Sequence, residues 1–175
     1  MHALNTGEVF PTQDVAALGG GRLSLGTPSK GFDWQLLIIY RGLHCPLCVE
    51  YLADLEALLP DFHAAGCDAV VASGDPQDKA AKMQSECALS MPVGYGLTTD
   101  QMISMGLYVS NPRSPQEADG RAFAEPGLFV IMPEGVLRMV DISNAPFLRP
   151  PLANVLRGMK ANQSDDYPTR GTFGR

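Results

Sequence analysis

Long apolar runs and an excess of basic residues are both missing from this sequence. Its longest unbroken apolar runs, counting tyrosine, are Leu36 to Tyr40 and Leu128 to Met132, far shorter than a membrane-spanning helix. The net charge of -6 leaves no excess of positive charge for phosphate binding. The chain therefore predicts neither a membrane nor a nucleic acid as a partner.

The start of the chain, MHALNTGEVF, lacks the basic stretch, the apolar stretch and the small-residue cleavage site of a signal peptide. A cytoplasmic protein is therefore expected, and cytoplasmic thiols are mostly kept reduced. Four cysteines in 175 residues are also too few for a disulfide scaffold. Any disulfide in this chain is expected to turn over rather than to hold the fold together.

The composition, 45% hydrophobic and 18% charged, is typical of a globular protein. We predict a single domain over residues 1–162 and a flexible C-terminal tail over residues 163–175, where periodicity ends. Two short strand-like pieces, GEVF and RLSLG, flank a triple glycine and predict an N-terminal β-hairpin. Apolar runs at residues 34–40 and 67–74 predict buried central strands.

Between those strands, apolar residues recur at steps of three and four from Val49 to Phe62, which predicts a helix that Pro60 should kink or end. Asp75 followed by Pro76 predicts the start of a second helix that ends near residue 89. Thr98 and Gln101 have the spacing of a capping box for a third. A β-hairpin over residues 127–142 and a helix over about 151–160 follow. This order predicts an α/β fold with a central mixed sheet flanked by helices.

Two cysteines stand three residues apart in the stretch LLIIYRGLHCPLCVEYL, where the first buried strand gives way to the first helix. Cys45 falls just before the helix, and Pro46 suits its first position. Unpaired N–H groups and the helix dipole favour a thiolate there, so an exposed Cys45 is the predicted nucleophile. Cys48 lies one turn later on the same face and is the predicted resolving thiol. His44, if protonated, would add positive charge beside the pair.

Two other interpretations of the pair are open at this stage. Both cysteines could be small core residues, although C-P-x-C at a strand-to-helix junction favours reactivity. A metal site would need four ligands, and the other cysteines and histidines form no second pair with suitable spacing. We predict no metal and no cofactor. Cys67 and Cys87 are interpreted as core residues, with a role for one of them as a distant resolving thiol left open.

Several segments together give the sequence a recognisable pattern: IIYRGLHCPLCVEYLADLEALL, VVASGDPQDKA, GLTTDQMISMGLYV and EPGLFVIMPEGVLRMV. The chain resembles the alkyl hydroperoxide reductase/thiol-specific antioxidant family, a peroxiredoxin-like branch of the thioredoxin superfamily, over most of residues 5–160. The resemblance implies a thioredoxin-like fold and thiol-based redox chemistry. It also implies a cis proline that faces the cysteines and shapes the substrate groove, which falls on Pro126. A trans proline that starts a strand is the alternative there.

The family also implies partners. They are a thiol reductant such as thioredoxin or glutathione, a disulfide or peroxide substrate, and a second copy of the chain in a homodimer. Typical members carry P-x-x-x-T-x-x-C and a later arginine that position the peroxide. Alignment of Cys48 with the family cysteine puts Cys45 at the threonine position and Arg41 at the proline position. Alignment of Cys45 puts Gly42 and Ile38 there, so neither register keeps the motif.

The family's arginine precedes the late strand, where this chain has Pro126, and Arg121 lies several residues away. Dithiol chemistry on protein disulfides is therefore the leading prediction, with peroxide reduction as a weaker activity, because placed donors are a large part of transition-state stabilisation. A non-catalytic binding module with the thioredoxin fold is the hypothesis from a different class.

Overall fold

Two fully buried parallel strands form the centre of the fold. β3 (Trp34–Ile39) pairs with β4 (Cys67–Ala72), residue by residue, from Trp34 opposite Cys67 to Ile39 opposite Ala72. Every residue of both strands is buried, because helices and loops cover the sheet on both faces. The prediction of central strands at these positions is confirmed.

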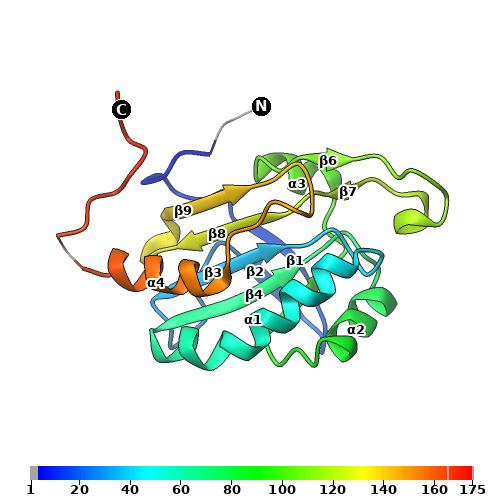
Figure 1. Ribbon diagram of the computed structural model, residues 1–175, viewed down its shortest axis with the longest axis horizontal. Coiled ribbons are helices and arrows are strands. Elements are labelled where there is room, and N and C mark those ends of the chain that lie inside the picture. The colour runs from blue at the N-terminus through cyan, green and yellow to red at the C-terminus, as the bar shows by residue number, and fades with distance from the viewer. Residues whose placement is uncertain (1–3, 165, 175) are drawn as a thin grey trace.

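The computed structural model describes residues 4–164 and 166–174 (Figure 1). One mixed sheet has the strand order β2-β1-β5-β4-β3-β8-β9. Its other strands are β1 (Gln13–Ala17), β2 (Arg22–Leu25), β5 (Val93–Tyr95), β8 (Gly127–Ile131) and β9 (Leu137–Ile142). A small second sheet joins β6 (Val109–Ser110) to β7 (Phe123–Ala124), and short 3-10 turns lie at Glu117–Gly120 and Pro133–Gly135.

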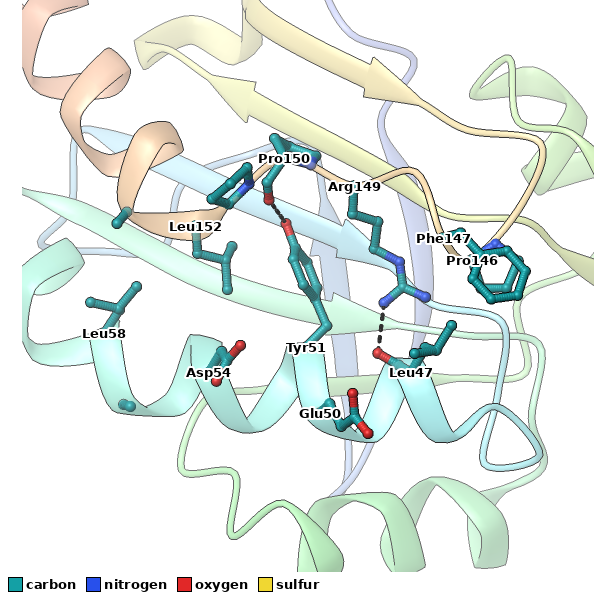
Figure 2. Close-up of a pocket in the computed structure, with 13 residues that line it drawn as sticks. Leu47, Glu50, Tyr51, Asp54, Leu58, Pro146, Phe147, Arg149, Pro150 and Leu152 are labelled. Atoms are coloured by element: carbon teal, nitrogen blue, oxygen red, sulfur yellow. Dashed lines mark hydrogen bonds between the residues drawn. The ribbon is translucent and has the colours of Figure 1, made fainter.

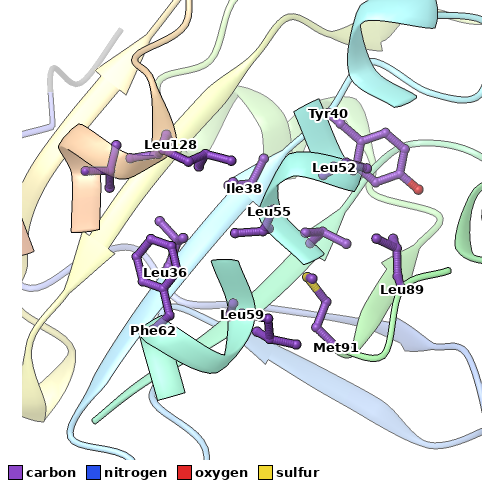
Figure 3. Close-up of a cluster of buried hydrophobic side chains, with 14 of the residues drawn as sticks. Leu36, Ile38, Tyr40, Leu52, Leu55, Leu59, Phe62, Leu89, Met91 and Leu128 are labelled. Atoms are coloured by element: carbon purple, nitrogen blue, oxygen red, sulfur yellow. The ribbon is translucent and has the colours of Figure 1, made fainter. Parts of the chain in front are cut away.

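The helices are α1 (Pro46–Ala64), α2 (Gln77–Glu86), α3 (Thr99–Ser104) and α4 (Leu152–Asn162). Residues of α1, α2 and α4 pack on one face of the sheet in a single apolar cluster, which Figure 3 shows around Leu52, Leu55 and Phe62. α3, the segment around Phe10 and the β6–β7 region cover the other face. The predicted α/β architecture with helices on both faces is confirmed.

The N-terminal hairpin is present, but its first strand lies elsewhere than predicted. β1 starts at Gln13, and the triple glycine Gly19–Gly21, with positive φ throughout, turns the chain into β2. Of the predicted strand GEVF, Val9 makes only an isolated bridge to Val136, while Phe10 packs in the core beside Phe129. The apolar residues Val9 and Phe10 therefore suggested a strand where the chain makes a single bridge and then enters the core.

Helix α1 runs through Pro60 rather than ending before it. The proline side chain is exposed, whereas Leu55, Leu59 and Phe62 are buried on the opposite side of the helix. Burial of these three side chains, each worth about 1.5–3 kcal/mol, outweighs the hydrogen bond that Pro60 cannot donate. The prediction that the helix ends near Leu59 is wrong for this reason.

The later elements lie close to their predicted ranges. Thr98 and Gln101 form the predicted capping box at the start of α3, and β8 and β9 form the predicted hairpin. The segment after α4 lies against β9, where the Arg138 guanidinium donates to the Tyr167 carbonyl and to the Thr169 hydroxyl. That the tail is flexible stays a prediction.

Candidate active site

Cys45 lies where the sequence predicts it, at the junction between the first central strand and its helix. After β3, residues 40–44 lead to Cys45, whose extended backbone makes it the N-cap of α1, with Pro46 in the first turn. The Cys45 carbonyl accepts from the N–H groups of Cys48, at 2.9 Å, and Val49, at 3.3 Å. The sulfur of Cys45 therefore stands at the positive end of a 19-residue helix.

A carboxylate fixes the loop that carries Cys45. Asp75 does not cap α2 as predicted; Pro76 holds that position. Instead the Asp75 Oδ2 accepts from the N–H of Leu43 at 2.7 Å. Gly42 allows this approach, because its φ is +136° and a Cβ there would lie 2.7 Å from Asp75 Oδ1. The loop before Cys45 is thus tied to the end of the neighbouring strand.

The two cysteine sulfurs are in direct contact. The Cys48 thiol donates to the Cys45 sulfur at 2.6 Å, and both residues are free cysteines. Both are also buried, with exposed fractions of 1% for Cys45 and 0% for Cys48. The prediction of an exposed Cys45 is wrong: side chains from later parts of the chain cover the helix N-terminus.

Arg149, from the segment between β9 and α4, is one of those covering residues. Its Nη2 lies 3.2 Å from the Cys48 sulfur and 3.9 Å from the Cys45 sulfur. Its Nη1 donates to the Leu47 carbonyl at 3.1 Å, and its guanidinium carbon lies 5.0 Å from the centroid of the Tyr51 ring (Figure 2). The Tyr51 hydroxyl in turn donates to the Pro150 carbonyl at 2.8 Å. These contacts hold a positive charge against both sulfurs.

A second arginine approaches Cys45 from the loop itself. Arg41 forms ion pairs with two buried carboxylates, Glu125 at 3.0 Å and Glu117 at 3.7 Å. Its guanidinium carbon lies 4.8 Å from the centroid of the Phe123 ring. Glu117, Phe123 and Glu125 all belong to the excursion that contains β6 and β7. The segment predicted as a polar loop therefore positions Arg41.

These neighbours separate the acidities of the two thiols. The hydrogen bond from Cys48 lowers the pKa of Cys45 against the opposing effect of burial, and a hydrogen bond from Arg41 and the charge of Arg149 lower it further. Donation to Cys45, together with burial, raises the pKa of Cys48 far above that of an ordinary thiol. Near neutral pH this arrangement favours a Cys45 thiolate beside a Cys48 thiol that keeps its proton.

His44 does not supply the positive charge suggested by its place in the sequence. Burial lowers its pKa, and the nearby charge of Arg41 lowers it further. Both ring nitrogens are buried without a hydrogen-bond partner, and the ring packs edge-on against Phe123 at 4.7 Å between centroids. A neutral His44 is the consequence, and the arginines provide the charge.

Comparison with protein families matches residues 6–140 to the AhpC/TSA family. The chain belongs to that family. No curated protein matches it. The family resemblance predicted from the sequence is therefore confirmed.

Solved structures confirm the peroxiredoxin-like form of the thioredoxin fold. A peroxiredoxin-like protein from Aquifex aeolicus has a TM-score of 0.75 at 17% identity, over 92% of this chain and 89% of that one. PrxQ from Xylella fastidiosa has a TM-score of 0.74 at 15% identity, over 94% and 100%. Peroxiredoxin 6 of Arenicola marina has a TM-score of 0.72 at 17% identity, over 92% and 74%.

Pro126 precedes β8 as predicted, but it is not the cis proline implied by the family resemblance. No peptide bond among residues 4–164 and 166–174 is cis. The Pro126 carbonyl accepts from the N–H of Ser143 at 3.0 Å, so this proline extends the β8–β9 hairpin. It lines a small internal cavity that Arg149 also lines. Where the family resemblance implies a cis proline against the cysteines, this structure has Arg149, 3.2 Å from the Cys48 sulfur and 3.9 Å from the Cys45 sulfur.

The remaining predicted residues lie outside the site. Cys67 is fully buried in β4, and Cys87, at the end of α2, contacts Met83 and the Val49 carbonyl. Burial raises the pKa of both thiols. Arg121 pairs with Asp119 on the exposed surface. The interpretation of Cys67 and Cys87 as core residues agrees with their burial.

Sequence reasoning missed Arg149 and the role of Arg41. Arg149 is 101 residues from Cys48, in a proline-rich segment with no pattern that singles it out. Arg41 stands in the cysteine motif itself, but it was considered only as the position of a missing proline. The charge needed beside a reactive thiolate is a signal that could have directed attention to it.

Two further properties of the described part of the chain bear on function. Residues 4–164 and 166–174 contain no group of three or more histidine, cysteine, aspartate or glutamate side chains arranged to hold a metal ion. Within the same residues no helix has the length and apolar character needed to cross a bilayer. His2, one of the histidines considered for a metal site, lies outside the described residues.

Proposed function

We propose that this member of the AhpC/TSA family is a thiol-dependent antioxidant oxidoreductase in which Cys45 is the nucleophile and Cys48 the resolving thiol. The observation that carries the proposal is the contact between the two sulfurs, with Arg149 against both. A thiolate needs positive charge beside it, and a resolving thiol must reach the oxidised sulfur. Both conditions are met without rearrangement of α1.

A hydroperoxide is the oxidant that this geometry favours. The Cys45 thiolate attacks the distal oxygen of ROOH, the O–O bond breaks, and the alkoxide takes a proton to leave as ROH, which leaves Cys45 as a sulfenic acid. The Cys48 sulfur then attacks the Cys45 sulfur, and hydroxide leaves as water with the proton from Cys48. Two thiols and one peroxide thus become one disulfide, one alcohol and one water.

Burial of the cysteines orders the two candidate substrates. A peroxide is small enough to reach a sulfur that is 1% exposed. A protein disulfide must bring its own backbone to the attacking sulfur, and here that sulfur is buried with the Arg149 side chain against it. Reduction of protein disulfides, which the C-P-L-C spacing favours, is therefore the second candidate, and it requires an opened form of the site.

In this proposal Arg41 and Arg149 take the role of the peroxide-positioning residues of the family motif, which this chain lacks. Arg149 Nη2 lies 3.9 Å from the Cys45 sulfur, and Arg41 hydrogen-bonds to that sulfur from a different segment, so both are candidates to donate to a peroxide oxygen that develops negative charge beside it. Donors placed in advance at such a point are a major source of rate acceleration. In this proposal the two arginines take the place of the family threonine.

The test compares wild type with Cys45→Ser and Cys48→Ser. Stopped-flow mixing of the reduced protein with hydrogen peroxide or an alkyl hydroperoxide should give one Cys45–Cys48 disulfide per peroxide in wild type. Cys48→Ser should stop at a Cys45 sulfenic acid that a dimedone-type probe captures. Cys67→Ser and Cys87→Ser are matched controls and should behave as wild type. Insulin-disulfide reduction, measured in parallel, should be slow.

Each alternative has its own result. If Cys45 and Cys48 react with neither peroxide nor disulfide in the native protein, the non-catalytic binding module is the function that the result supports. Rapid insulin reduction with slow peroxide consumption would establish disulfide reduction as the activity. A sulfenic acid that forms only in the Cys45→Ser variant would reverse the two roles. In the cycle as we propose it, a thiol reductant such as thioredoxin or glutathione regenerates the dithiol.

A further inference from the structure

An apolar groove lies beside the cysteine pair, between α1 and the segment that leads into α4. It has a volume of about 610 Å³ and is lined by Tyr51, Leu58, Phe147, the prolines at 146, 150 and 151, and their neighbours. Figure 2 shows Tyr51 and Leu58 on α1, with Phe147 and Pro150 on the segment that faces it. A space of this size suits a small molecule, and Phe147, 80% exposed at its rim, leaves the groove open to solvent.

Arg149 connects this groove to the buried sulfurs. The guanidinium lines the groove and at the same time contacts Cys48 at 3.2 Å. Leu47, whose carbonyl accepts from Arg149, is also part of the lining. The Arg149 side chain therefore lies between a molecule in the groove and Cys48. In the reduced protein the Cys45 thiolate attracts Arg149 to the sulfurs, and formation of the disulfide removes that negative charge.

Thiol exchange chemistry favours attack at the sulfur on this side. An incoming thiolate can attack either sulfur of the Cys45–Cys48 disulfide, and the other sulfur then leaves as a thiolate. The leaving group with the lower pKa leaves faster. The hydrogen bond between the two thiols, the largest cause of their different pKa values, is absent once either sulfur is in a disulfide. A hydrogen bond from Arg41 and the charge of Arg149 still lower the pKa of Cys45, and burial still raises that of Cys48, so attack on Cys48 with departure of Cys45 is the faster path.

The charges of the groove describe the molecule that fits it. Glu50 and Asp54, one turn apart on α1, place two carboxylates along the wall, and Arg149 places a guanidinium at the sulfur end. A thiolate directed to Arg149 and an ammonium group directed to the carboxylates would match both ends. The apolar side chains between them would contact the carbon skeleton.

We propose that this groove binds a zwitterionic aminothiol, which reduces the Cys45–Cys48 disulfide by attack on Cys48. The thiolate forms a bond to the Cys48 sulfur, the Cys45–Cys48 bond breaks, and Cys45 leaves as a thiolate. A second thiolate then attacks the sulfur of the bound thiol, which departs as a symmetric disulfide while Cys48 takes up a proton. The Cys45–Cys48 disulfide that the aminothiol reduces is the product of the proposed peroxidase cycle, so this inference rests on the proposed function.

The point of attack is tested on the oxidised wild-type protein. The disulfide is made with one equivalent of diamide, so the test does not depend on peroxide chemistry. Cysteamine is added for a short time, free thiols are alkylated, and fragmentation of the peptide that contains both cysteines locates the adduct. The expected result is cysteamine on Cys48 and the alkyl group on Cys45. The opposite assignment would overturn the proposal.

The groove is tested by one variant with a matched control. Ala57→Trp places an indole in the groove, whereas Ala53 lies on the same helix, is equally exposed and does not line it. Ala57→Trp should slow reduction of the disulfide by cysteamine about tenfold, and Ala53→Trp should leave the rate unchanged. Equal rates for the two tryptophan variants would exclude the groove as the route.

Charge recognition is tested with cysteamine, 2-mercaptoethanol and 3-mercaptopropionate at equal thiolate concentrations. The rates should fall in that order. The double variant Glu50→Gln/Asp54→Asn should slow the reduction of the disulfide by cysteamine about threefold, as expected for the loss of exposed ion pairs. It should also make the reduction rates of the three thiols more alike. The control Asp61→Asn should keep the order. A rate order that ignores charge in wild type would exclude the aminothiol. Failure of peroxide to oxidise the pair, with these results intact, would contradict only the proposed function.

Discussion

The four cysteines of this chain occupy two kinds of environment. All four belong to one apolar cluster, but Cys45 and Cys48 also share a helix N-terminus with two arginines in reach. All four are buried, so exposure does not separate the two groups. The pKa shifts single out one member of the pair: the thiol of Cys45 is made more acidic, whereas the pKa values of Cys48, Cys67 and Cys87 are raised. In this molecule nearby charge and hydrogen bonds, rather than solvent access, distinguish Cys45 from the other three thiols.

The largest effect expected from this comparison is the loss of chemistry on removal of one sulfur. Cys45→Ser should lower the rate constant for peroxide consumption by about a thousandfold or more, as removal of a catalytic nucleophile does, because no other thiol has a lowered pKa. Cys67→Ser and Cys87→Ser should stay within about twofold of wild type. Stopped-flow peroxide consumption measures all three. A comparable loss of peroxide consumption in Cys67→Ser would show that Cys67 also takes part in the chemistry.

The pH dependence of thiol alkylation should separate the two environments next. Cys45 should react with an inflection well below the ordinary thiol pKa of about 8.5, since its pKa is lowered. Cys67 and Cys87 should stay unreactive up to higher pH. Rates of iodoacetamide labelling, resolved by peptide mass mapping, give each inflection. Simultaneous labelling of Cys45 and Cys87 across the pH range would contradict the assignment.

The same shifts have opposite consequences for the stability of the reduced protein. The lowered pKa of Cys45 adds stability that is complete above the ordinary thiol pKa and is lost as pH falls through the lowered value. The raised pKa of Cys67 contributes stability below the ordinary value, which is lost as pH rises through the raised one. Urea unfolding of the Cys45→Ser and Cys67→Ser variants at several pH values would resolve these two trends.

At neutral pH, replacement of a core cysteine should cost stability rather than activity. Cys67→Ser places a hydroxyl at a position that is fully buried between β3 and α1, at a cost of about 1–3 kcal/mol in the free energy of unfolding. Cys67→Ala avoids the buried hydroxyl and should cost less. Urea unfolding monitored by circular dichroism measures both. Equal stability of the serine variant and wild type would show that Cys67 is not a packing residue.

The smallest effect concerns the charge that distinguishes the reactive pair. Arg149→Met keeps much of the side-chain volume but removes a positive charge 3.9 Å from the Cys45 sulfur, so the pKa of Cys45 should rise by about one unit or more. The rate of peroxide consumption at pH 6 should then fall about tenfold and recover partly at higher pH. Arg149→Lys should restore most of the rate. A pH profile identical to wild type would assign Arg149 a purely structural role.

The sequence predicted the parts of this molecule that local pattern determines. The buried strands β3 and β4, the helix that begins at the C-P-L-C motif and the capping box at Thr98 all follow from periodicity and end signals within a few residues. The position of Cys45 as N-cap of α1 follows in the same way. A strand, a proline and an apolar helix face specify that junction without help from distant residues.

The parts that failed depend on contacts between distant residues. Asp75 is expected to cap α2, but Pro76 is the N-cap of that helix. The Asp75 carboxylate instead accepts from the N–H of Leu43, 32 residues away. Arg149 lies against Cys45 and Cys48, and the β6–β7 excursion pairs with Arg41 through Glu117 and Glu125; no local pattern predicts either contact. Pro126 was assigned a cis bond only through the family resemblance, and in the structure it extends a hairpin in the trans form.

The contact between the two sulfurs also bears on how this protein resists damage. A sulfenic acid that waits for a distant partner is exposed to a second peroxide, which converts it irreversibly to a sulfinic acid. Here the partner sulfur is already 2.6 Å away, so no unwinding of α1 separates oxidation from disulfide formation. In the proposed cycle, this short path would suit the protein to a sudden excess of oxidant, because Cys45 would survive as a disulfide that a thiol can reopen.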